Sequence, residues 1–182
     1  MPRYTPKDHT FVICAYKENA FLDECVASIM TQKDLGEVII STSTPNDSIS
    51  AVAKKYNIPI VVNPHPHLAG DDWNYGYNSA QTKLVTIVHQ DDYYEPHFLE
   101  RTLEVFNSYA DDIIIAFSDY FELRNGERIY SNKIMQVKRK LNAPLANKSL
   151  NKSKIVRRRM LGLGCAICCP AVTLNKELLG TT

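Results

Sequence analysis

The sequence predicts an α/β fold in which helices flank a mostly parallel central sheet. The chain has 182 residues, of which 45% are hydrophobic and 23% charged, the balance of one soluble globular domain. Short, continuously apolar segments of strand length recur along its first two thirds. Amphipathic segments with helical spacing alternate with them, and this alternation favours right-handed β-α-β units.

The first half of the chain contains three such strands and two helices. Residues 10–15 (TFVICA) form an uninterrupted apolar run, typical of a strand buried on both faces of a parallel sheet. Between residues 21 and 32, apolar side chains recur at one-turn spacing, which predicts an amphipathic helix. A second strand is expected at 37–40, a second helix at 49–56 and a third strand at 58–62.

The alternation continues to about residue 120 and then stops. A weaker helix is expected at 73–80, a fourth strand at 84–88 (LVTIV), a fourth helix at 98–106 and a fifth strand at 113–117. Beyond these elements, Arg-Asn-Gly-Glu at 124–127 is typical of a hairpin turn.

Charge is distributed very unevenly along the chain. Residues 1–132 hold 19 acidic and 10 basic side chains, whereas residues 133–159 hold 10 basic side chains and no acidic one. Residues 133–159 show no clear periodicity, so a basic loop is expected there. Such a segment is either a solvated loop or a surface that meets an anion, such as a phosphate, a membrane surface or a nucleic acid.

The five cysteines are expected to be free thiols in a reducing, cytoplasmic setting, because the N-terminal residues have no secretory leader pattern. Cys165, Cys168 and Cys169 have a metal-like spacing, but no second pair accompanies them, which favours buried structural thiols over zinc. The uncharged run at 160–174 is too short for a membrane-spanning helix and contains Pro170.

Ligands of parallel sheets bind at the carboxyl ends of the strands, which places the candidate chemistry in the loops at 16–18, 41–47, 63–67 and 89–92. None of these loops has the glycine pattern of a dinucleotide site or of a P-loop. A dehydrogenase or a P-loop NTPase is therefore not expected.

His89-Gln90-Asp91-Asp92 follows the fourth strand and is the sharpest local feature. Adjacent carboxylates at a strand end can hold Mg²⁺ or Mn²⁺, hard ions that share oxygen ligands with substrate phosphates. The alternative is helix capping, because acidic residues are favoured just before a helix such as the one expected after Pro96.

Several motifs in one order resemble the family 2 glycosyltransferases, which have the GT-A fold. The segment FVICAYKENAFLDECVASIMTQ at 11–32 is similar to the opening of that family. Asn-Tyr-Gly at 74–76 with Ala80, HQDDYYEP at 89–96 and Ser-Asp-Tyr at 118–120 follow in the family's order. The chain departs from the family where its second strand ends in STSTPND, and at His89, where an aspartate is usual.

The resemblance implies a single GT-A-like domain over 1–182, with a nucleotide-sugar-binding half at 1–120. Residues 121–182 would form an incomplete acceptor-side half that lacks the region of the acceptor base, so the catalytic base is not identified and truncation is expected. Metal binding would belong to Asp91 and Asp92. The nucleotide-binding residues implied are Ala15, Tyr16, Glu18, Thr42, Ser43, Asn74, His89 and Gln90.

The activity implied is metal-assisted, inverting transfer of a sugar from a UDP-linked donor to a glycan or lipid-linked acceptor, with Mg²⁺ or Mn²⁺ as cofactor. The positive charge of residues 133–159 fits this activity in two ways: the segment would either close over the nucleotide diphosphate or face an anionic or membrane-borne acceptor, in peripheral association with a membrane. A catalytically silent donor-binding domain is the first alternative. A basic nucleic-acid-binding module is the second, but residues 133–159 contain no aromatic side chain for base stacking, so no nucleic-acid partner is expected.

Overall fold

The computed structural model describes residues 3–109 and 113–181, and the chain divides into two compact units. The first unit comprises Met1–Ala116 and Val172–Thr182, and the second comprises Phe117–Ala171. The end of the chain therefore returns to the first unit, whereas the sequence suggested halves at 1–120 and 121–182.

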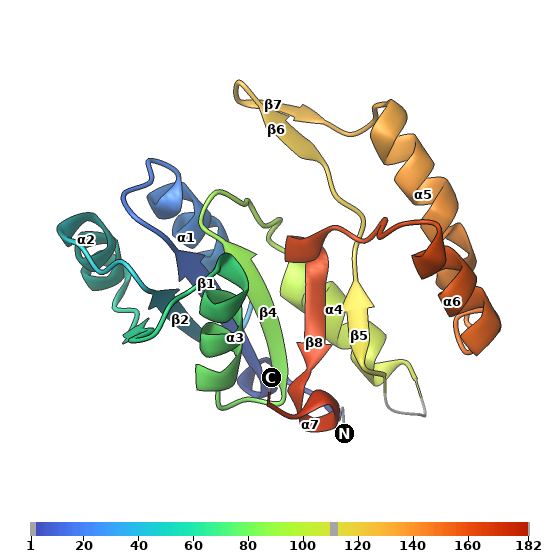
Figure 1. Cartoon of the computed structure of the whole chain (residues 1–182), viewed down its shortest axis with the longest axis horizontal. Helices are drawn as coiled ribbons and strands as arrows, with labels where there is room; N and C mark the ends of the chain where they lie inside the picture. The colour runs from blue at the N-terminus through green and yellow to red at the C-terminus, as the bar shows by residue number, and fades with distance from the viewer. Residues whose placement is uncertain (1–2, 110–112, 182) are drawn as a thin grey trace. The chain divides into compact units, whose positions relative to one another are not determined.

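A six-stranded sheet with the order β3-β2-β1-β4-β8-β5 is the centre of the fold (Figure 1). β1 pairs in parallel with β2 and β4, and β2 pairs in parallel with β3. β8 pairs with β4 in the antiparallel direction. The mostly parallel α/β sheet is thus confirmed. Its strands are β1 (His9–Ala15), β2 (Glu37–Thr42), β3 (Ile60–Val62), β4 (Leu84–His89), β5 (Ile115–Phe117) and β8 (Val172–Asn175).

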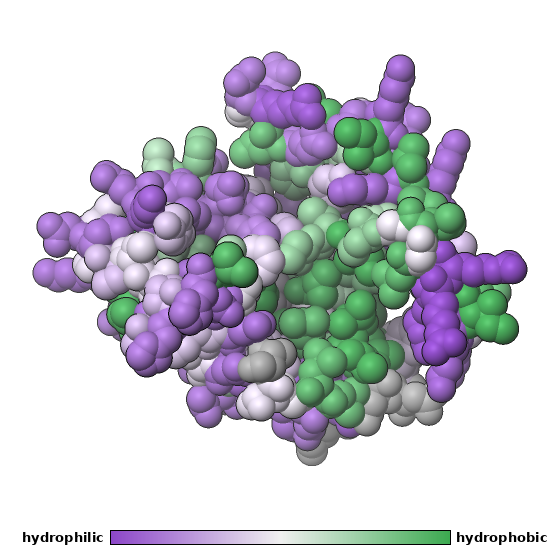
Figure 2. All heavy atoms as spheres, viewed as in Figure 1, coloured by the Kyte–Doolittle hydropathy of each residue, from purple (hydrophilic) through white to green (hydrophobic). Residues whose placement is uncertain are grey.

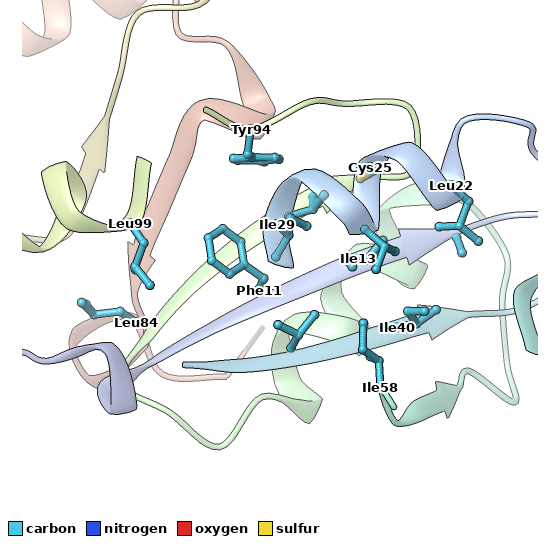
Figure 3. Packing of buried hydrophobic residues seen from close by; sticks show 14 of the residues in the cluster. Phe11, Ile13, Leu22, Cys25, Ile29, Ile40, Ile58, Leu84, Tyr94 and Leu99 are labelled. Atoms are coloured by element: carbon cyan, nitrogen blue, oxygen red, sulfur yellow. The ribbon is translucent and has the colours of Figure 1, made fainter. Parts of the chain in front are cut away.

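Helices cover both faces of this sheet, because successive side chains of a strand point to opposite faces. Phe11 and Ile13 of β1 pack in the larger core with α1, α2 and α4 (Figure 3). Val12 lies in a second core with Tyr77 and Ala80, at the end of α3. The helices of this unit are α1 (Leu22–Met30), α2 (Asp47–Tyr56), α3 (Ala69–Ser79), α4 (Phe98–Asn107) and α7 (Lys176–Leu179), preceded by a short 3-10 helix at Pro6–Asp8.

The second unit begins with the predicted hairpin. β6 (Glu122–Arg124) and β7 (Glu127–Ile129) pair antiparallel. The two turn residues, Asn125 and Gly126, have φ values of 51° and 80°, as a type I′ turn requires.

The prediction of a basic loop over 133–159 is wrong, because this segment forms α5 (Lys133–Ala146) and α6 (Lys154–Gly162). Asn132 and Ser153 cap the two helices by accepting hydrogen bonds from backbone N–H groups. Each helix buries a single methionine, Met135 or Met160. With so few buried positions, the apolar periodicity that reveals a helix in a sequence is missing.

The prediction of buried thiols also fails at the end of the second unit. Cys165 and Cys169 are exposed and Cys168 is half-buried, beside a short 3-10 helix at Cys169–Ala171. Cys25 of α1 is buried. The apolar run at 160–174 is divided between the end of α6, this turn and β8, so its cysteines have no common core to enter. Among the helices of the described ranges, none has the length and apolar character needed to cross a lipid bilayer.

Candidate functional site

The carboxyl ends of β1, β2 and β4 meet at one edge of the sheet, because these strands are adjacent and parallel. Ala15 at the end of β1 lies in register with Thr42 at the end of β2, and Cys14 lies in register with His89 at the end of β4. The loops that follow the three strands carry most of the predicted site residues.

Gln90 joins the loop after β4 to the loop after β1. Its side-chain oxygen accepts a hydrogen bond from the backbone N–H of Tyr16, and its side-chain nitrogen donates to the carbonyl of Tyr16, both at 3.0 Å. The side-chain amide of Gln90 thus takes the place of a backbone peptide group, and it continues the hydrogen bonding between β1 and β4 by one residue. Two predicted site residues are brought together, and the Tyr16 ring is left half-exposed.

Asp72, in the first turn of α3, joins the ends of β2 and β3. Its two carboxylate oxygens accept hydrogen bonds from Ser43 Oγ at 2.6 Å and from Asn63 Nδ2 at 2.8 Å. Ser43 was among the predicted residues, whereas Asp72 was not. The partners are separated by 9 and 29 positions in the sequence, and no local pattern connects them.

His89 is held between an aromatic ring and a carboxylate. The Trp73 ring of α3 stacks on it with centroids 4.9 Å apart and an interplanar angle of 20°, and His89 Nδ1 lies 3.6 Å from Asp92 Oδ2. Asn74, the neighbour of Trp73, is exposed. The stack joins His89, one of the predicted site residues, to a ring of α3.

The carboxylates of Asp91 and Asp92 lie in the turn that follows β4. The N–H of Asp92 donates to the carbonyl of His89 at 3.1 Å and closes this turn. Asp91 is exposed and Asp92 is half-buried. The pKa of Asp92 is raised, mainly because burial disfavours its charged form and also because Asp91 is close, although His89 acts in the opposite direction.

Two buried polar atoms in this turn have no hydrogen-bond partner within the described part of the chain: His89 Nε2 and Asp92 Oδ2. Behind them, Cys25 Sγ donates to the carbonyl of His89. Burial raises the pKa of that thiol, and the nearby carboxylates of Asp92 and Asp91 raise it further. Cys25 therefore stays a neutral thiol. Because unpaired buried polar atoms are costly, the turn is suited to a ligand that supplies the missing partner.

An open hollow of about 530 Å³ lies between the loops after β1 and β2. Lys17, with a left-handed φ of 56°, donates its N–H to Thr44 Oγ1 and so fixes the two loops to each other. The predicted residue Glu18 lines this hollow, whereas Lys17 and Thr44 were not among the predicted residues. The full lining is Lys17, Glu18, Thr44, Pro45, Asn46, Asp47 and Ser48.

Two predicted residues lie beneath the surface of the site. Ala15 and Thr42 are buried, and the hydroxyl of Thr42 accepts a hydrogen bond from the N–H of Thr44 at 3.0 Å. Ala15 and Thr42 therefore lie below the exposed loop residues, at the ends of β1 and β2.

The oxygen ligands at the end of β4 fit a hard divalent cation. Mg²⁺ and Mn²⁺ are often held by one or two carboxylates, with water and substrate phosphate as the other ligands. Asp91 and Asp92 supply two carboxylates, and one oxygen of Asp92 is buried without a hydrogen-bond partner in the described part of the chain. Over residues 3–109 and 113–181, no group of three or more His, Cys, Asp and Glu side chains forms a complete protein cage for a metal.

The model of a family described as glycosyl transferase family 2 matches residues 10–179, which is most of the chain. None of the curated proteins searched matches.

Solved structures with the same fold include a synthase, a mannosyltransferase and TarS. Glucosyl-3-phosphoglycerate synthase from Mycobacterium tuberculosis, solved with Mn²⁺, UDP and phosphoglyceric acid, is 17% identical with a TM-score of 0.64, over 95% of this chain and 57% of that one. The mannosyltransferase PcManGT from Pyrobaculum calidifontis, solved with GDP-Man and Mn²⁺, is 16% identical with a TM-score of 0.63. The match covers 100% of this chain and 49% of that one. S. aureus TarS is 17% identical with a TM-score of 0.50, and the match covers 56% of this chain and 32% of that one. The chain thus spans between about a third and three fifths of these proteins.

Proposed function

Because this chain belongs to glycosyl transferase family 2, we propose that it transfers a sugar from a UDP-linked donor to a glycan or lipid-linked acceptor, with inversion and with a divalent cation. The fold is that of the GT-A nucleotide-sugar transferases. The mycobacterial synthase was solved with UDP and Mn²⁺, which supports the choice of this nucleotide and this type of ion.

The observation that carries the proposal is the convergence of three strand ends on one edge of the sheet. There the hollow beside Glu18 lies next to the loop fixed by Tyr16 and Gln90. We assign the nucleotide to this region, with Ser43, Asn74 and His89 at its border. The Gln90 and Asp72 hydrogen bonds hold the loops in place before the donor arrives, which lowers the ordering cost of binding.

Asp91 and Asp92 are the residues that would hold the cation. When bound, such an ion neutralises the negative charge that develops on a diphosphate leaving group. The chain itself positions the Asp92 carboxylate, because the N–H of Asp92 donates to the carbonyl of His89, whose ring stacks on Trp73. Burial of Asp92 keeps water away from one of its oxygens.

A thermal-shift panel of UDP, GDP, CDP and ADP, with and without Mn²⁺, tests this proposal. Binding at about 100 times the dissociation constant adds roughly 2.7 kcal/mol of stability, a shift of a few degrees for a domain of this size. We expect UDP to stabilise the chain in a Mn²⁺-dependent manner, and Asp91→Asn to abolish that dependence. Asp34→Asn, an exposed site away from the strand ends, is the matched control and should behave like the wild type.

Other outcomes would change specific parts of the proposal. If another nucleotide stabilises the chain instead, that nucleotide and not UDP would be the one that carries the donor sugar. If a nucleotide stabilises the chain equally with and without Mn²⁺, and equally in Asp91→Asn, Asp91 does not hold a cation. If no nucleotide stabilises the chain, the proposed donor site is refuted.

A further inference from the structure

The second unit is strongly basic. Residues 117–171 hold 12 Lys and Arg side chains and 3 Asp and Glu side chains. Of those acids, Asp119 accepts a hydrogen bond from Arg139 Nε at 2.6 Å, and Glu122 pairs with Arg124. The remaining positive charge is concentrated on α5 and α6, and neither helix contains an acidic residue.

The exposed side of α5 combines cations with aliphatic side chains. Ile134 and Val137, which are 66% and 57% exposed, lie one turn apart. Lys133 and Lys140 are exposed on the same side of the helix. Met135 points the other way and is fully buried, so the side that carries Ile134 faces solvent.

The same combination occurs on α6, which follows α5 in a helical hairpin (Figure 1). Ile155 and Leu161 are 69% and 55% exposed and lie one turn before and after Arg158. Lys154, Arg158 and Arg159 are exposed as well, whereas Met160 is buried. Figure 2 shows long hydrophilic side chains projecting beside hydrophobic ones in this region.

We propose that the α5–α6 hairpin docks on an anionic lipid bilayer. Exposed aliphatic side chains next to cations are typical of helices that lie in the membrane interface, where the cations contact headgroup phosphates and the aliphatic groups enter the boundary of the acyl chains. The docking face consists of Ile134, Val137, Lys140, Lys154, Ile155, Arg158, Arg159 and Leu161.

A lipid surface explains this face better than a nucleic acid does. Positive charge alone would serve either partner. Ile134, Val137, Ile155 and Leu161 have no apolar counterpart on a phosphodiester backbone. Residues 133–159 also lack the aromatic side chains on which single-stranded bases stack.

Co-sedimentation of the full chain with vesicles tests the docking directly. We expect binding to phosphatidylcholine vesicles that contain about 30% phosphatidylglycerol, little binding to phosphatidylcholine alone, and weaker binding as NaCl rises from about 0.1 to 0.5 M. The triple variant Lys154→Gln, Arg158→Gln, Arg159→Gln should lower the partition coefficient by about 100-fold. The double variant Ile155→Gln, Leu161→Gln should lower it by about 10-fold or more.

A matched control removes the same number of charges from the first unit. Lys7→Gln, Lys33→Gln, Lys54→Gln changes three exposed lysines and should leave the partition coefficient within about threefold of the wild type. A loss equal to that of the α6 triple variant would overturn the proposal, because net charge alone would then explain binding. Far-UV circular dichroism of each variant verifies that the helices are intact.

Two further outcomes would also overturn the docking. One is an unchanged affinity of the Ile155→Gln, Leu161→Gln variant. The other is binding of a DNA duplex or single-stranded RNA without binding of vesicles, which would assign the basic hairpin to a nucleic acid. The proposal does not depend on the donor site, because nucleotide-induced stabilisation is measured separately from vesicle binding.

Discussion

Single polar residues connect the strands inside the sheet. His9 of β1 is fully buried, and its Nε2 lies 2.8 Å from Thr86 Oγ1 of β4. Thr86 Oγ1 in turn lies 2.6 Å from Thr173 Oγ1 of β8. The three side chains form a hydrogen-bonded chain across adjacent strands, which gives partners to His9 Nε2 and to the two buried hydroxyls. Within the described part of the chain, His9 Nδ1 has no hydrogen-bond partner.

The pKa of His9 makes the stability of the fold dependent on pH. Burial disfavours the imidazolium and lowers this pKa from 6.5 to about 3. Below pH 6.5 the unfolded chain therefore binds a proton that the folded chain does not accept. The free energy of unfolding should fall by about 1.4 kcal/mol per pH unit between pH 6.5 and 3, and the contribution is absent above pH 6.5.

Urea unfolding at pH 7 and pH 5 measures this effect. Between pH 7 and pH 5, the free energy of unfolding of the wild type should fall by about 2 kcal/mol more than that of His9→Gln. Glutamine keeps a polar group near Thr86 and cannot be protonated in this range. If the free energy of unfolding falls equally in both proteins, His9 does not contribute to the pH dependence of stability.

At the scale of elements, the position of α3 depends on a close approach at Gly76. A Cβ atom at this position would lie 2.6 Å from Val12 Cγ1 of β1 and 3.0 Å from Ser41 Cβ of β2. The contact lets α3 lie directly on the two strands whose ends form the candidate site. It also gives a physical reason for the glycine in the Asn-Tyr-Gly motif.

Gly76→Ala should destabilise the protein by about 1–3 kcal/mol, because the added methyl group forces α3 away from the sheet. Gly70 in the same helix is the control, because a Cβ atom there would meet nothing within 4 Å. Gly70→Ala should be neutral or stabilise by up to about 1 kcal/mol. Thermal unfolding of both variants decides the point, and equal effects would contradict the packing argument.

At the scale of the whole molecule, the end of the chain completes the first unit. β8 enters the sheet beside β4, and the following residue, Lys176, reaches the end of α3. Its Nζ donates to the carbonyls of Tyr77, Asn78 and Ala80 at 3.0, 2.9 and 2.5 Å. One ammonium group thereby satisfies three carbonyls at a helix end, where partners within the helix are missing.

Lys176→Met should lower the free energy of unfolding by about 1–3 kcal/mol, because these carbonyls lose a charged donor. Methionine keeps most of the aliphatic length of the side chain. Lys54→Met, at an exposed position of α2, should change stability by less than about 0.5 kcal/mol. If chemical denaturation shows similar values for the two variants, Lys176 does not hold the end of the chain in place.

Most elements of the first unit could be predicted from the sequence because their burial produces a regular pattern. β1 and β4 are mostly apolar and almost entirely buried, and α4 has a stripe of buried residues such as Leu99 and Leu103. β8 was missed because its four residues follow an apolar segment without a period of their own. α5 and α6 were missed because their helical faces are largely exposed and charged.

Local patterns of polarity in the chain were sufficient to predict the first five strands of the sheet, the helices between them and the loops that leave the strand ends. Which side chains meet at those ends depends on the tertiary structure: Gln90 with Tyr16, Asp72 with Ser43 and Asn63, and Trp73 with His89. These pairs bring together residues from different strands and helices. Their distances therefore follow from sheet order and helix packing, which no local pattern encodes.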